Sequence, residues 1–529
     1  MTTFQGTRAV RPADGSAGRV VMIGAGPLTA ADVLAVARGG AQVELTAQAL
    51  AAVRHGREII EALANDSQPH YGVSTGFGAL ATRHIPVELR AQLQLSLVRS
   101  HAATSGPEVE SEVVRALMLL RLATLATGRT GAREQTVHAY AALLNSGLTP
   151  VVREYGSLGC SGDLAPLAHC ALTLTGEGVV TDAAGRERQA AEALAEAGLT
   201  PLELREKEGL ALINGTDGML GMLILAIADL RELLKVADIT AAMSVEALLG
   251  TDAVFAADLQ ELRPHPGQAV AAANLRALLA GSAIMASHRG PECTRVQDAY
   301  SLRCAPQVSG AARDTADHAA LVASRELASA IDNPVITPDG RVESNGNFHG
   351  APLGYVLDFL AIAAADVASM SERRTDRFLD VARSQGLTPF LANDPGVDSG
   401  HMIAQYTQAA IVSELKRLAA PASVDSIPSS AMQEDHVSMG WSAARKLRRA
   451  LDGLTRVLAI ELLTAARGID LRAPLAPAPA TGAVVAGLRA TVPGPGADRF
   501  LAPEIAAAVR YVADGGALRA AEAVTGQLG

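Results

Sequence analysis

The residues best suited to chemistry lie in one short segment, Tyr155–His169, which reads YGSLGCSGDLAPLAH. A serine hydrolase elbow would need a glycine two residues after Ser161, where Asp163 stands. A simpler interpretation is a helix start, with Ser161 or Asp163 capping a helix from Leu164 onward and Pro166 in its first turn. That interpretation leaves the glycines and small residues in front of the helix unexplained.

The triplet Cys160–Ser161–Gly162 also permits a reaction of the backbone itself. In a tight turn the Gly162 amide nitrogen can attack the carbonyl carbon of Cys160, because glycine has no Cβ to obstruct the approach. Loss of one water closes a five-membered ring, and loss of the Ser161 hydroxyl as a second water leaves an exocyclic methylene. The triplet could therefore generate an electrophile from the chain alone.

Two other patterns are weaker. The stretch VVMIGAGPLTA starts like a dinucleotide-binding fold, but Thr29 stands where the third glycine belongs and Pro27 lies inside the turn. We expect no further β–α alternation after it and therefore no nucleotide binding. The run Glu434–Asp435–His436 could be a metal cluster, but no other ligands follow at a suitable spacing.

The elements that must position these residues are mostly helical. Hydrophobic residues make up 49% of the 529 residues and aromatic ones only 3%, a composition that favours long aliphatic helices. Apolar spacing predicts helices over 31–37, 47–65, 87–105, 108–126, 215–249, 318–330, 353–374, 399–419 and 441–466. Glycines predict loops at 71–80 and 156–162, and turn residues predict hairpins at 177–188 and 334–344. Five prolines predict an exposed connector over 472–496, before a last helical pair.

The net charge, the cysteine content and the apolar runs of the sequence disfavour several classes of protein. The net charge is −10 without a basic patch, which disfavours a nucleic-acid binder. The four cysteines form no C-x-x-C pair and are too few for a disulfide framework. Residues 1–19 lack the apolar stretch of a signal peptide, and the most apolar run, 218–228, is too short to span a bilayer. We therefore expect a soluble cytoplasmic protein without membrane partners.

Several long motifs resemble one family. From about Pro27 to about Leu471 the sequence is similar to the histidine ammonia-lyases, within the aromatic amino-acid lyases and aminomutases. The motifs that carry this resemblance are YGVSTGFG, SHAATSG, GSLGCSGDLAPLAH, KEGLALINGT, VQDAYSLRCAPQ, NGNFHG and SVDSIPSSAMQEDHVSMG. The family forms 4-methylidene-imidazol-5-one (MIO) from an Ala-Ser-Gly triplet. The resemblance thus implies autocatalytic MIO formation from Cys160, Ser161 and Gly162, with cysteine as a departure at the first position and no external cofactor.

The resemblance also assigns roles to residues that have plainer interpretations. Tyr71 matches the catalytic tyrosine, although an ordinary loop tyrosine is the alternative, and Asn214 matches an asparagine near the MIO ring, although it could cap a helix from Thr216. Because a free tyrosine ionises only near pH 10, we expect an alkaline activity optimum. Arg303 should bind the substrate carboxylate, unless it forms only a surface salt bridge. The remaining matches are Gln297 and Tyr300, which share two turns with Arg303 if this stretch is helical, and Phe348, a pocket residue or plain core.

Substrate preference depends on two places. Ser100-His101-Ala102 resembles the histidine-specific form of the family, and Gln433-Glu434 provides a carboxylate that phenylalanine and tyrosine lyases lack. A carboxylate can pair with an imidazole or an ammonium group. Beside a phenyl ring the free-energy cost of its desolvation would not be offset by any such interaction. The resemblance therefore implies elimination of ammonia from L-histidine to give trans-urocanate, with the amino group accepted by the MIO methylene. The alternatives are a tyrosine or phenylalanine ammonia-lyase, a 2,3-aminomutase, or, remotely, a non-catalytic helical scaffold.

The predicted fold class is mainly α, a fumarase/aspartase-like bundle of long helices with minor β hairpins. We expect a flexible tail over 1–20, an N-terminal domain with the MIO loop over 21–214, and the bundle with C-terminal helices over 215–529. The family resemblance further implies a homotetramer of 222 symmetry whose active sites are each built by three subunits. Tyr71 and Arg303 of one site would then come from different chains.

Overall fold

The computed structural model describes residues 18–66, 70–76, 83–290, 293 and 296–529. The chain divides into two compact units, each made of three separate stretches. The first unit comprises Met1–Leu225, Ala320–Leu357 and Ala422–Arg445, and the second comprises Ala226–Ala319, Asp358–Pro421 and Lys446–Gly529. The domain limits predicted at residues 20 and 214 stay a prediction. Most of the predicted tail and the end of the predicted loop 71–80 lie outside the described residues.

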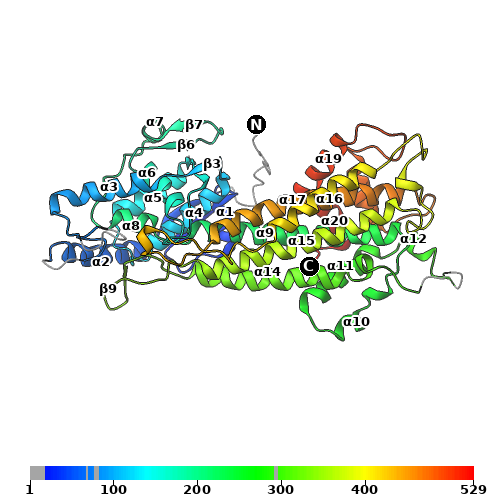
Figure 1. The fold of residues 1–529 in the computed structure, drawn as a ribbon, viewed down its shortest axis with the longest axis horizontal. Helices are drawn as coiled ribbons and strands as arrows, with labels where there is room; N and C mark the ends of the chain where they lie inside the picture. Colours follow the sequence, from blue (N-terminus) through cyan, green and yellow to red (C-terminus); the bar gives the residue numbers. More distant parts are fainter. Residues whose placement is uncertain (1–17, 67–69, 77–82, 291–292, 294–295) are drawn as a thin grey trace. The chain divides into compact units, whose positions relative to one another are not determined.

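The first unit begins with a β–α–β arrangement. Strand β1 (Val20–Ile23) pairs in parallel with β2 (Gln42–Leu45). Helix α1 (Ala30–Ala37), which is labelled in Figure 1, connects them. A capping box fixes the start of α1, because Thr29 and Asp32 each accept a backbone hydrogen bond from the other. The expectation that no β–α alternation follows this stretch was therefore wrong. The four-residue strands were too short to stand out by apolar spacing.

Short helices and small sheets complete the first unit. The predicted helix 87–105 ends early, at His101, because Ala102 leaves the helical conformation with a ψ of 63° and Ser105–Glu108 form a strand. Both predicted hairpins are confirmed, β6 with β7 and β8 with β9. The helical elements are α2 (Ala47–Ala64), η2 (Val87–Leu89), α3 (Arg90–His101), α4 (Ser111–Ala126), α5 (Glu134–Asn145), α6 (Leu164–Leu174), α7 (Ala190–Glu196), α8 (Glu208–Ile213) and η5 (Ser430–Met432). The strands are β3 (Ser105–Glu108), β4 (Thr149–Pro150), β5 (Arg153–Tyr155), β6 (Val179–Thr181), β7 (Glu187–Gln189), β8 (Val335–Ile336) and β9 (Val342–Glu343).

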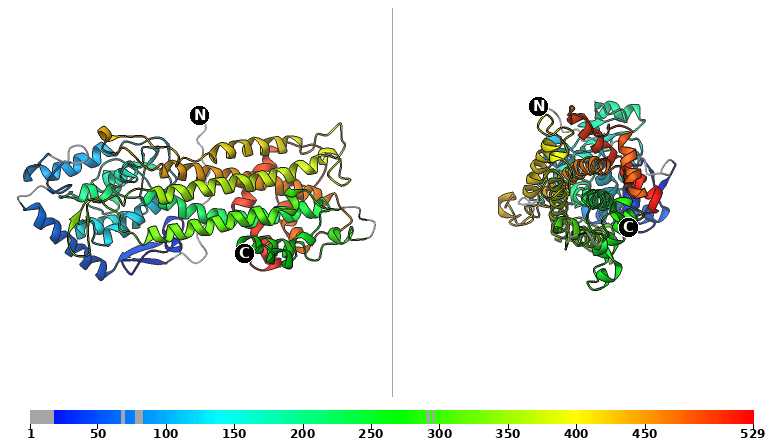
Figure 2. Two further views of the ribbon diagram at one scale, coloured as in Figure 1. Left: turned by 60° about the horizontal axis from the view of Figure 1, so that its bottom comes forward. Right: turned by 90° about the vertical axis from the view of Figure 1, so that its right-hand side faces the viewer.

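Long helices dominate the second unit, which confirms the predicted mainly α class. Their segments in this unit run side by side (Figure 2). Buried polar contacts join them: Glu461 accepts hydrogen bonds from Ser244 (2.7 Å) and Arg374 (2.9 Å), and Gln408 donates to the Val457 carbonyl (2.9 Å). The long helices are α9 (Asp217–Ala247), α14 (Ala305–Leu327), α15 (Ala351–Leu379), α16 (Met402–Leu418) and α17 (Gly440–Asp470). The shorter ones are η3 (Ala253–Phe255), α10 (Ala257–Glu261), α11 (Pro266–Leu279), α12 (Ala283–Ala286), α13 (Tyr300–Arg303), η4 (Pro389–Leu391), α18 (Pro479–Arg489), α19 (Ala502–Ala513) and α20 (Gly516–Thr525).

The proline-rich stretch 472–496 is not an exposed connector throughout. It contains helix α18, whose Ala480, Val484 and Leu488 are buried. Pro479 occupies the first turn of this helix, where no intrahelical partner is needed for a backbone N–H. The proline that suggested a linker therefore starts a helix. The helical pair predicted after it is confirmed as α19 and α20.

Among the described residues, one helix is long and apolar enough to cross a membrane by length and composition alone. This helix is α15, not the run 218–228 that appears most apolar in the sequence. Within its most apolar window, 61% of the residues are buried in the structure. A buried core helix passes the same test of length and composition.

Candidate active site

The triplet Cys160–Ser161–Gly162 forms a tight turn in the first unit. The Gly162 amide donates to the Gly159 carbonyl across the turn at 3.2 Å. Ser161 has a φ of 51°, in the left-handed region that non-glycine residues rarely adopt. Such a conformation is strained and persists only where the surroundings enforce it. The turn that the predicted cyclisation needs is thus present in the unmodified chain.

Its surroundings hold the turn by direct backbone contact. The Gly215 amide donates to the Ser161 carbonyl (3.1 Å), and the Asp163 amide donates to the Gly215 carbonyl (2.7 Å). A Cβ on Gly162 would overlap that same carbonyl oxygen, and a Cβ on Gly159 would overlap the carbonyl oxygen of Ser438. The cradle therefore accepts only glycine at both positions. This fit supports the triplet as the precursor of the MIO group.

The side chain of Asp163 connects the turn to neighbouring segments by hydrogen bonds. Helix α6 starts at Leu164 as predicted, but the Asp163 side chain makes no capping hydrogen bond to it. Instead, this carboxylate accepts from the Ser157 hydroxyl and from the Met219 amide, both at 2.9 Å. Burial raises the pKa of Asp163 to about 7. The interpretation of Asp163 as a simple helix cap was therefore wrong.

Asn214 is buried at the end of α8, and its side chain is hydrogen-bonded to the polar segment that contains Asp332 and Asn333. Its side-chain amide donates to the Asn333 carbonyl (2.8 Å) and to the Asp332 carboxylate (3.3 Å). Its own carbonyl accepts from the Arg121 guanidinium. The backbone of Thr216, not of Asn214, accepts the first hydrogen bond of α9, from Leu220. The alternative in which the Asn214 side chain caps α9 is therefore not what the structure shows.

The segment of residues 332–334 also lies next to the loops of two further predicted residues, Phe348 and Tyr71. The Asn345 side chain donates to the Asp332 carbonyl (2.9 Å), which fixes the loop leading to the half-buried Phe348. Tyr71 is half-buried in its loop, and its neighbour Gly72 packs so closely on Leu210 that a Cβ there would overlap it. The ideal Cβ of Gly72 would also lie 3.3 Å from Pro334 Cδ. The loops of Tyr71, Asn214 and Phe348 thus converge on residues 332–334.

The hydroxyl group of one serine, Ser429, connects Glu434 to Cys160 of the triplet. The Ser429 hydroxyl donates to the Glu434 carboxylate at 2.9 Å, and the Cys160 sulfur lies 3.0 Å from the same hydroxyl oxygen. Burial is the main cause that raises the pKa of the Cys160 thiol, and the Glu434 charge adds to it. Gln433 is exposed on the same loop. The structure therefore brings the Glu434 carboxylate close to Cys160, the first residue of the triplet.

His101 takes a separate place at the end of α3. Its Nδ1 lies 2.9 Å from the Leu97 carbonyl oxygen and 3.1 Å from the Ser100 hydroxyl. No contact among the described residues joins it to Glu434. Its role in reading an imidazole stays a prediction.

Three predicted residues belong to the second unit. Helix α13 contains Tyr300 and Arg303 but begins after Gln297, so the condition of a helical stretch is met for two of the three residues. The Arg303 guanidinium lies 4.7 Å from the centre of the Tyr300 ring, which is 70% exposed. The buried Arg303 Nε has no hydrogen-bond partner among the described residues. No ion pair of Arg303 is seen there either, so the salt-bridge alternative lacks support.

The sequence did not reveal the residues that join the loops. Ser429 and Ser157 lie within recognised motifs, but nothing in their spacing predicts that they bind Glu434 and Asp163. His349 and His436 stack with ring centroids 5.5 Å apart and link the Phe348 and Glu434 loops. Among the described residues, no group of three or more His, Cys, Asp or Glu is placed to hold a metal ion.

Comparisons with known proteins identify the family of this chain. The family model described as aromatic amino acid lyase matches residues 28–490. The chain is 67% identical to a histidine ammonia-lyase of Streptomyces avermitilis, over 96% of this chain and 99% of that protein. Among solved structures, it resembles the tyrosine aminomutase of Streptomyces globisporus (TM-score 0.90, 40% identity, 96% of this chain and all of that one). It also resembles the histidine ammonia-lyase of Trypanosoma cruzi (TM-score 0.87, 38% identity, covering 96% and 95%). On this evidence the chain belongs to the aromatic amino acid lyase family.

Proposed function

We propose that this chain is a histidine ammonia-lyase, which eliminates ammonia from L-histidine to give trans-urocanate. The observation that carries the proposal is the path from Glu434 through Ser429 to Cys160, with contacts of 2.9 and 3.0 Å. Glu434 is thus a carboxylate beside the triplet, and it would pair with an imidazole or an ammonium group of the substrate. The relatives named histidine ammonia-lyase, at 65–67% identity, support the same substrate.

The prosthetic group follows from the triplet. Cys160, Ser161 and Gly162 would form the MIO ring, which supplies an electrophilic methylene once it exists. The glycine-only cradle of Gly159 and Gly162 holds the backbone for this ring closure. Asn214, fixed by Asp332 and Asn333, would hydrogen-bond near the ring.

The remaining residues would bind the substrate and move its proton. Tyr71 would remove the β-proton as a general base, and Arg303 would pair with the carboxylate through its planar guanidinium. Tyr300 would stand beside the prosthetic group, and Gln297, Phe348, Gln433 and His101 would line the substrate site. Tyr71 and Arg303 belong to different compact units of the chain. The family resemblance implies a homotetramer whose sites are shared between subunits, and we propose this assembly together with a cytoplasmic location.

Two measurements test the proposal. Mass spectrometry of the peptide containing residues 160–162 should show a deficit of two waters, and Ser161→Ala should remove the deficit and nearly all activity without unfolding the protein. A wild-type peptide of unmodified mass would refute the prosthetic group.

Product analysis with histidine, tyrosine and phenylalanine tests the substrate. We expect urocanate from histidine, and we expect Glu434→Gln and His101→Phe to depress this turnover far more than they affect folding. The similarity to a tyrosine aminomutase makes a β-amino acid product from tyrosine the second candidate. Such a product, or histidine kinetics unchanged in both variants, would overturn the assignment.

A further inference from the structure

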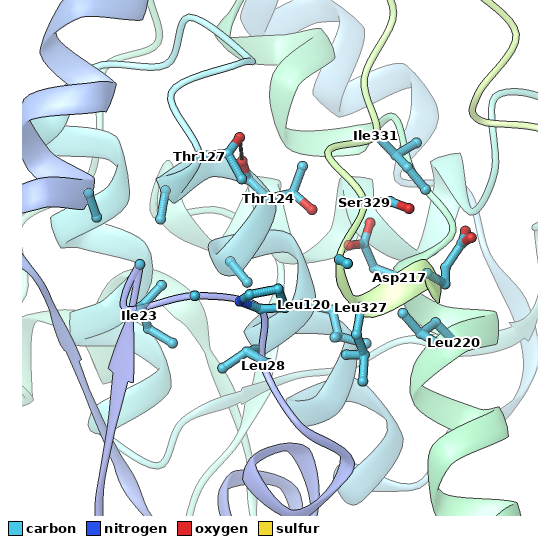
Figure 3. Close-up of a pocket in the computed structure, with 18 of the residues that line it drawn as sticks. Ile23, Leu28, Leu120, Thr124, Thr127, Asp217, Leu220, Leu327, Ser329 and Ile331 are labelled. Atoms are coloured by element: carbon cyan, nitrogen blue, oxygen red, sulfur yellow. Dashed lines mark hydrogen bonds between the residues drawn. The ribbon is translucent and has the colours of Figure 1, made fainter. Parts of the chain in front are cut away.

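The first unit contains a cavity of about 350 Å³ apart from the proposed active site (Figure 3). Its walls come from the turn after β1, from α2 and α4, from the start of α9 and from the end of α14. None of the predicted catalytic or substrate-binding residues lines it. It is at the small end of the size range of ligand sites in proteins.

The cavity has an exposed mouth and a buried floor. Gly26, Gln48 and Ser329 are exposed among its lining residues, whereas Leu120 and Asp217 are buried. Figure 3 shows the side chains of Leu120, Leu28 and Ile331 together with Asp217 around one space. A ligand entering from solvent would therefore meet apolar walls and then a carboxylate.

The charges of the lining are one-sided. Asp217 and Glu326 both line the cavity, and none of the described residues in its lining is a lysine, arginine or histidine. Asp217 is 6% exposed, and its Oδ2 makes no hydrogen bond among the described residues. Arg121 lies behind it, with Nε 3.5 Å from this oxygen, beyond a well-formed hydrogen bond. Glu326 accepts a hydrogen bond from the Thr216 hydroxyl at 2.5 Å.

The Arg121 guanidinium faces Asp217, whereas Glu326 forms no ion pair among the described residues, so Glu326 is the carboxyl group of this cavity without a cationic partner. Among the described residues no group of three or more His, Cys, Asp or Glu is placed to hold a metal ion, and the lining combines hydroxyl-bearing residues such as Thr124 and Ser329 with the apolar Leu28, Leu120, Leu220, Leu327 and Ile331. An ammonium group on a short apolar chain satisfies both features. Its N–H groups would donate to the carboxylates, and its chain would be buried against the leucines.

We propose that this cavity binds a small primary alkylammonium ion, with its charged end between Asp217 and Glu326 and its chain toward the mouth. The inference does not rest on the proposed lyase activity. The site is nevertheless near the triplet in space, because Gly215, two residues before Asp217, is hydrogen-bonded through its backbone to Ser161 and Asp163.

The test uses the full-length protein with butylammonium chloride as the probe and butan-1-ol as its neutral counterpart, measured by calorimetry. We expect saturable binding of butylammonium only. Glu326→Gln should weaken it at least about tenfold, because a charge-assisted hydrogen bond is lost. Ala123→Leu should abolish it by filling the cavity. Asp317→Asn, which removes an exposed carboxylate from the same helix α14, should leave it unchanged.

Other results would overturn the inference. Equal binding of butanol would mean an apolar cavity without recognition of charge. Binding that survives both Glu326→Gln and Ala123→Leu, or that excess L-histidine displaces, would place the amine elsewhere. The absence of binding to the wild-type protein would refute the site outright.

Discussion

The loop around Ser161 and the short helix α13 differ in how completely their polar groups are hydrogen-bonded. In the loop, the Ser161 carbonyl and the Asp163 amide pair with Gly215, and the carboxylate of Asp163 has two hydrogen-bond donors. In α13, the Tyr300 ring is 70% exposed and the buried Arg303 Nε has no partner among the described residues. Both regions carry residues that the family resemblance assigns to one active site.

The difference fits two separate tasks. Closing a ring within the backbone requires a fixed geometry before any substrate arrives, and contacts from the same unit supply it. Binding a carboxylate requires a guanidinium that is still free to pair. An unpaired buried Nε is costly, so a ligand or another chain that satisfies it gains affinity. We therefore expect substitutions in the loop to abolish the prosthetic group and substitutions in α13 to affect binding.

The largest effect should come from Gly162→Ala. The new Cβ would overlap the Gly215 carbonyl oxygen, and the φ of 81° disfavours alanine. Turnover should fall roughly a thousandfold or more, and the two-water mass deficit should disappear, because the electrophile does not form. Gly147→Ala is the matched control, since Gly147 has a φ of 79° with open space around it. If Gly162→Ala retains the mass deficit, the cradle does not control ring closure.

Arg303→Ala should have the next largest effect. The KM for histidine should rise about a hundredfold through loss of a bidentate charge-assisted pair. The melting temperature should change little, because, among the described residues, Nε has no hydrogen bond to lose and the guanidinium interacts only with the ring of the exposed Tyr300. A large fall in melting temperature with an unchanged KM would make Arg303 structural.

The same variant can test whether sites are shared between chains. Tyr71→Phe and Arg303→Ala should each be nearly inactive alone at low substrate concentration. Co-expressed, they should form mixed tetramers in which some sites contain both native residues, so part of the activity should return. Sedimentation should show a particle of four chains. Mixed particles without activity, or a fully active monomer, would contradict shared sites.

Ser429→Ala should have a moderate effect. Without the hydroxyl, Glu434 loses its 2.9 Å hydrogen bond, and kcat/KM for histidine should fall about tenfold. Ser429→Thr keeps the hydroxyl and should restore most of it. Ser426→Ala is the control, because Ser426 accepts from the Val437 amide instead. Equal losses in Ser429→Ala and Ser426→Ala would mean that the segment, and not the hydroxyl, matters.

The smallest effect should be a pH dependence of stability. Unfolded Asp163 ionises above about pH 3.8, but the folded carboxyl keeps its proton up to about pH 7. The folded state therefore binds more protons in this window, so its stability falls as pH rises and levels off above pH 7. The loss between pH 6 and 7 should be about 1 kcal/mol. Urea unfolding at several pH values should show this slope in the wild type relative to Asp163→Asn, and parallel curves would refute it.

The sequence predicted motifs better than the contacts between them. The triplet, the loop of Tyr71, both hairpins and the long helices follow from local spacing, turn residues and composition. Ser429 reaches Cys160 across 269 positions of the chain, and no local pattern reports such a pair. Helix α18 and the pair β1–β2 were missed for a local reason, since a proline also starts helices and four residues give little periodicity. The local pattern also did not show where the short helix α13 begins, and Gln297 lies just outside it.

The chain passes between its two compact units after residues 225, 319, 357, 421 and 445. Four of these passages lie inside continuous helices: α9, α14, α15 and α17. Neither unit corresponds to one uninterrupted stretch of gene, so a single crossover between two related genes cannot exchange a whole unit. Recombination would instead join halves of helices from different parents, and only parents with matching helix cores would give a folded product. Such chimaeras should therefore tolerate breakpoints in surface loops such as 182–186 far better than breakpoints at the unit boundaries.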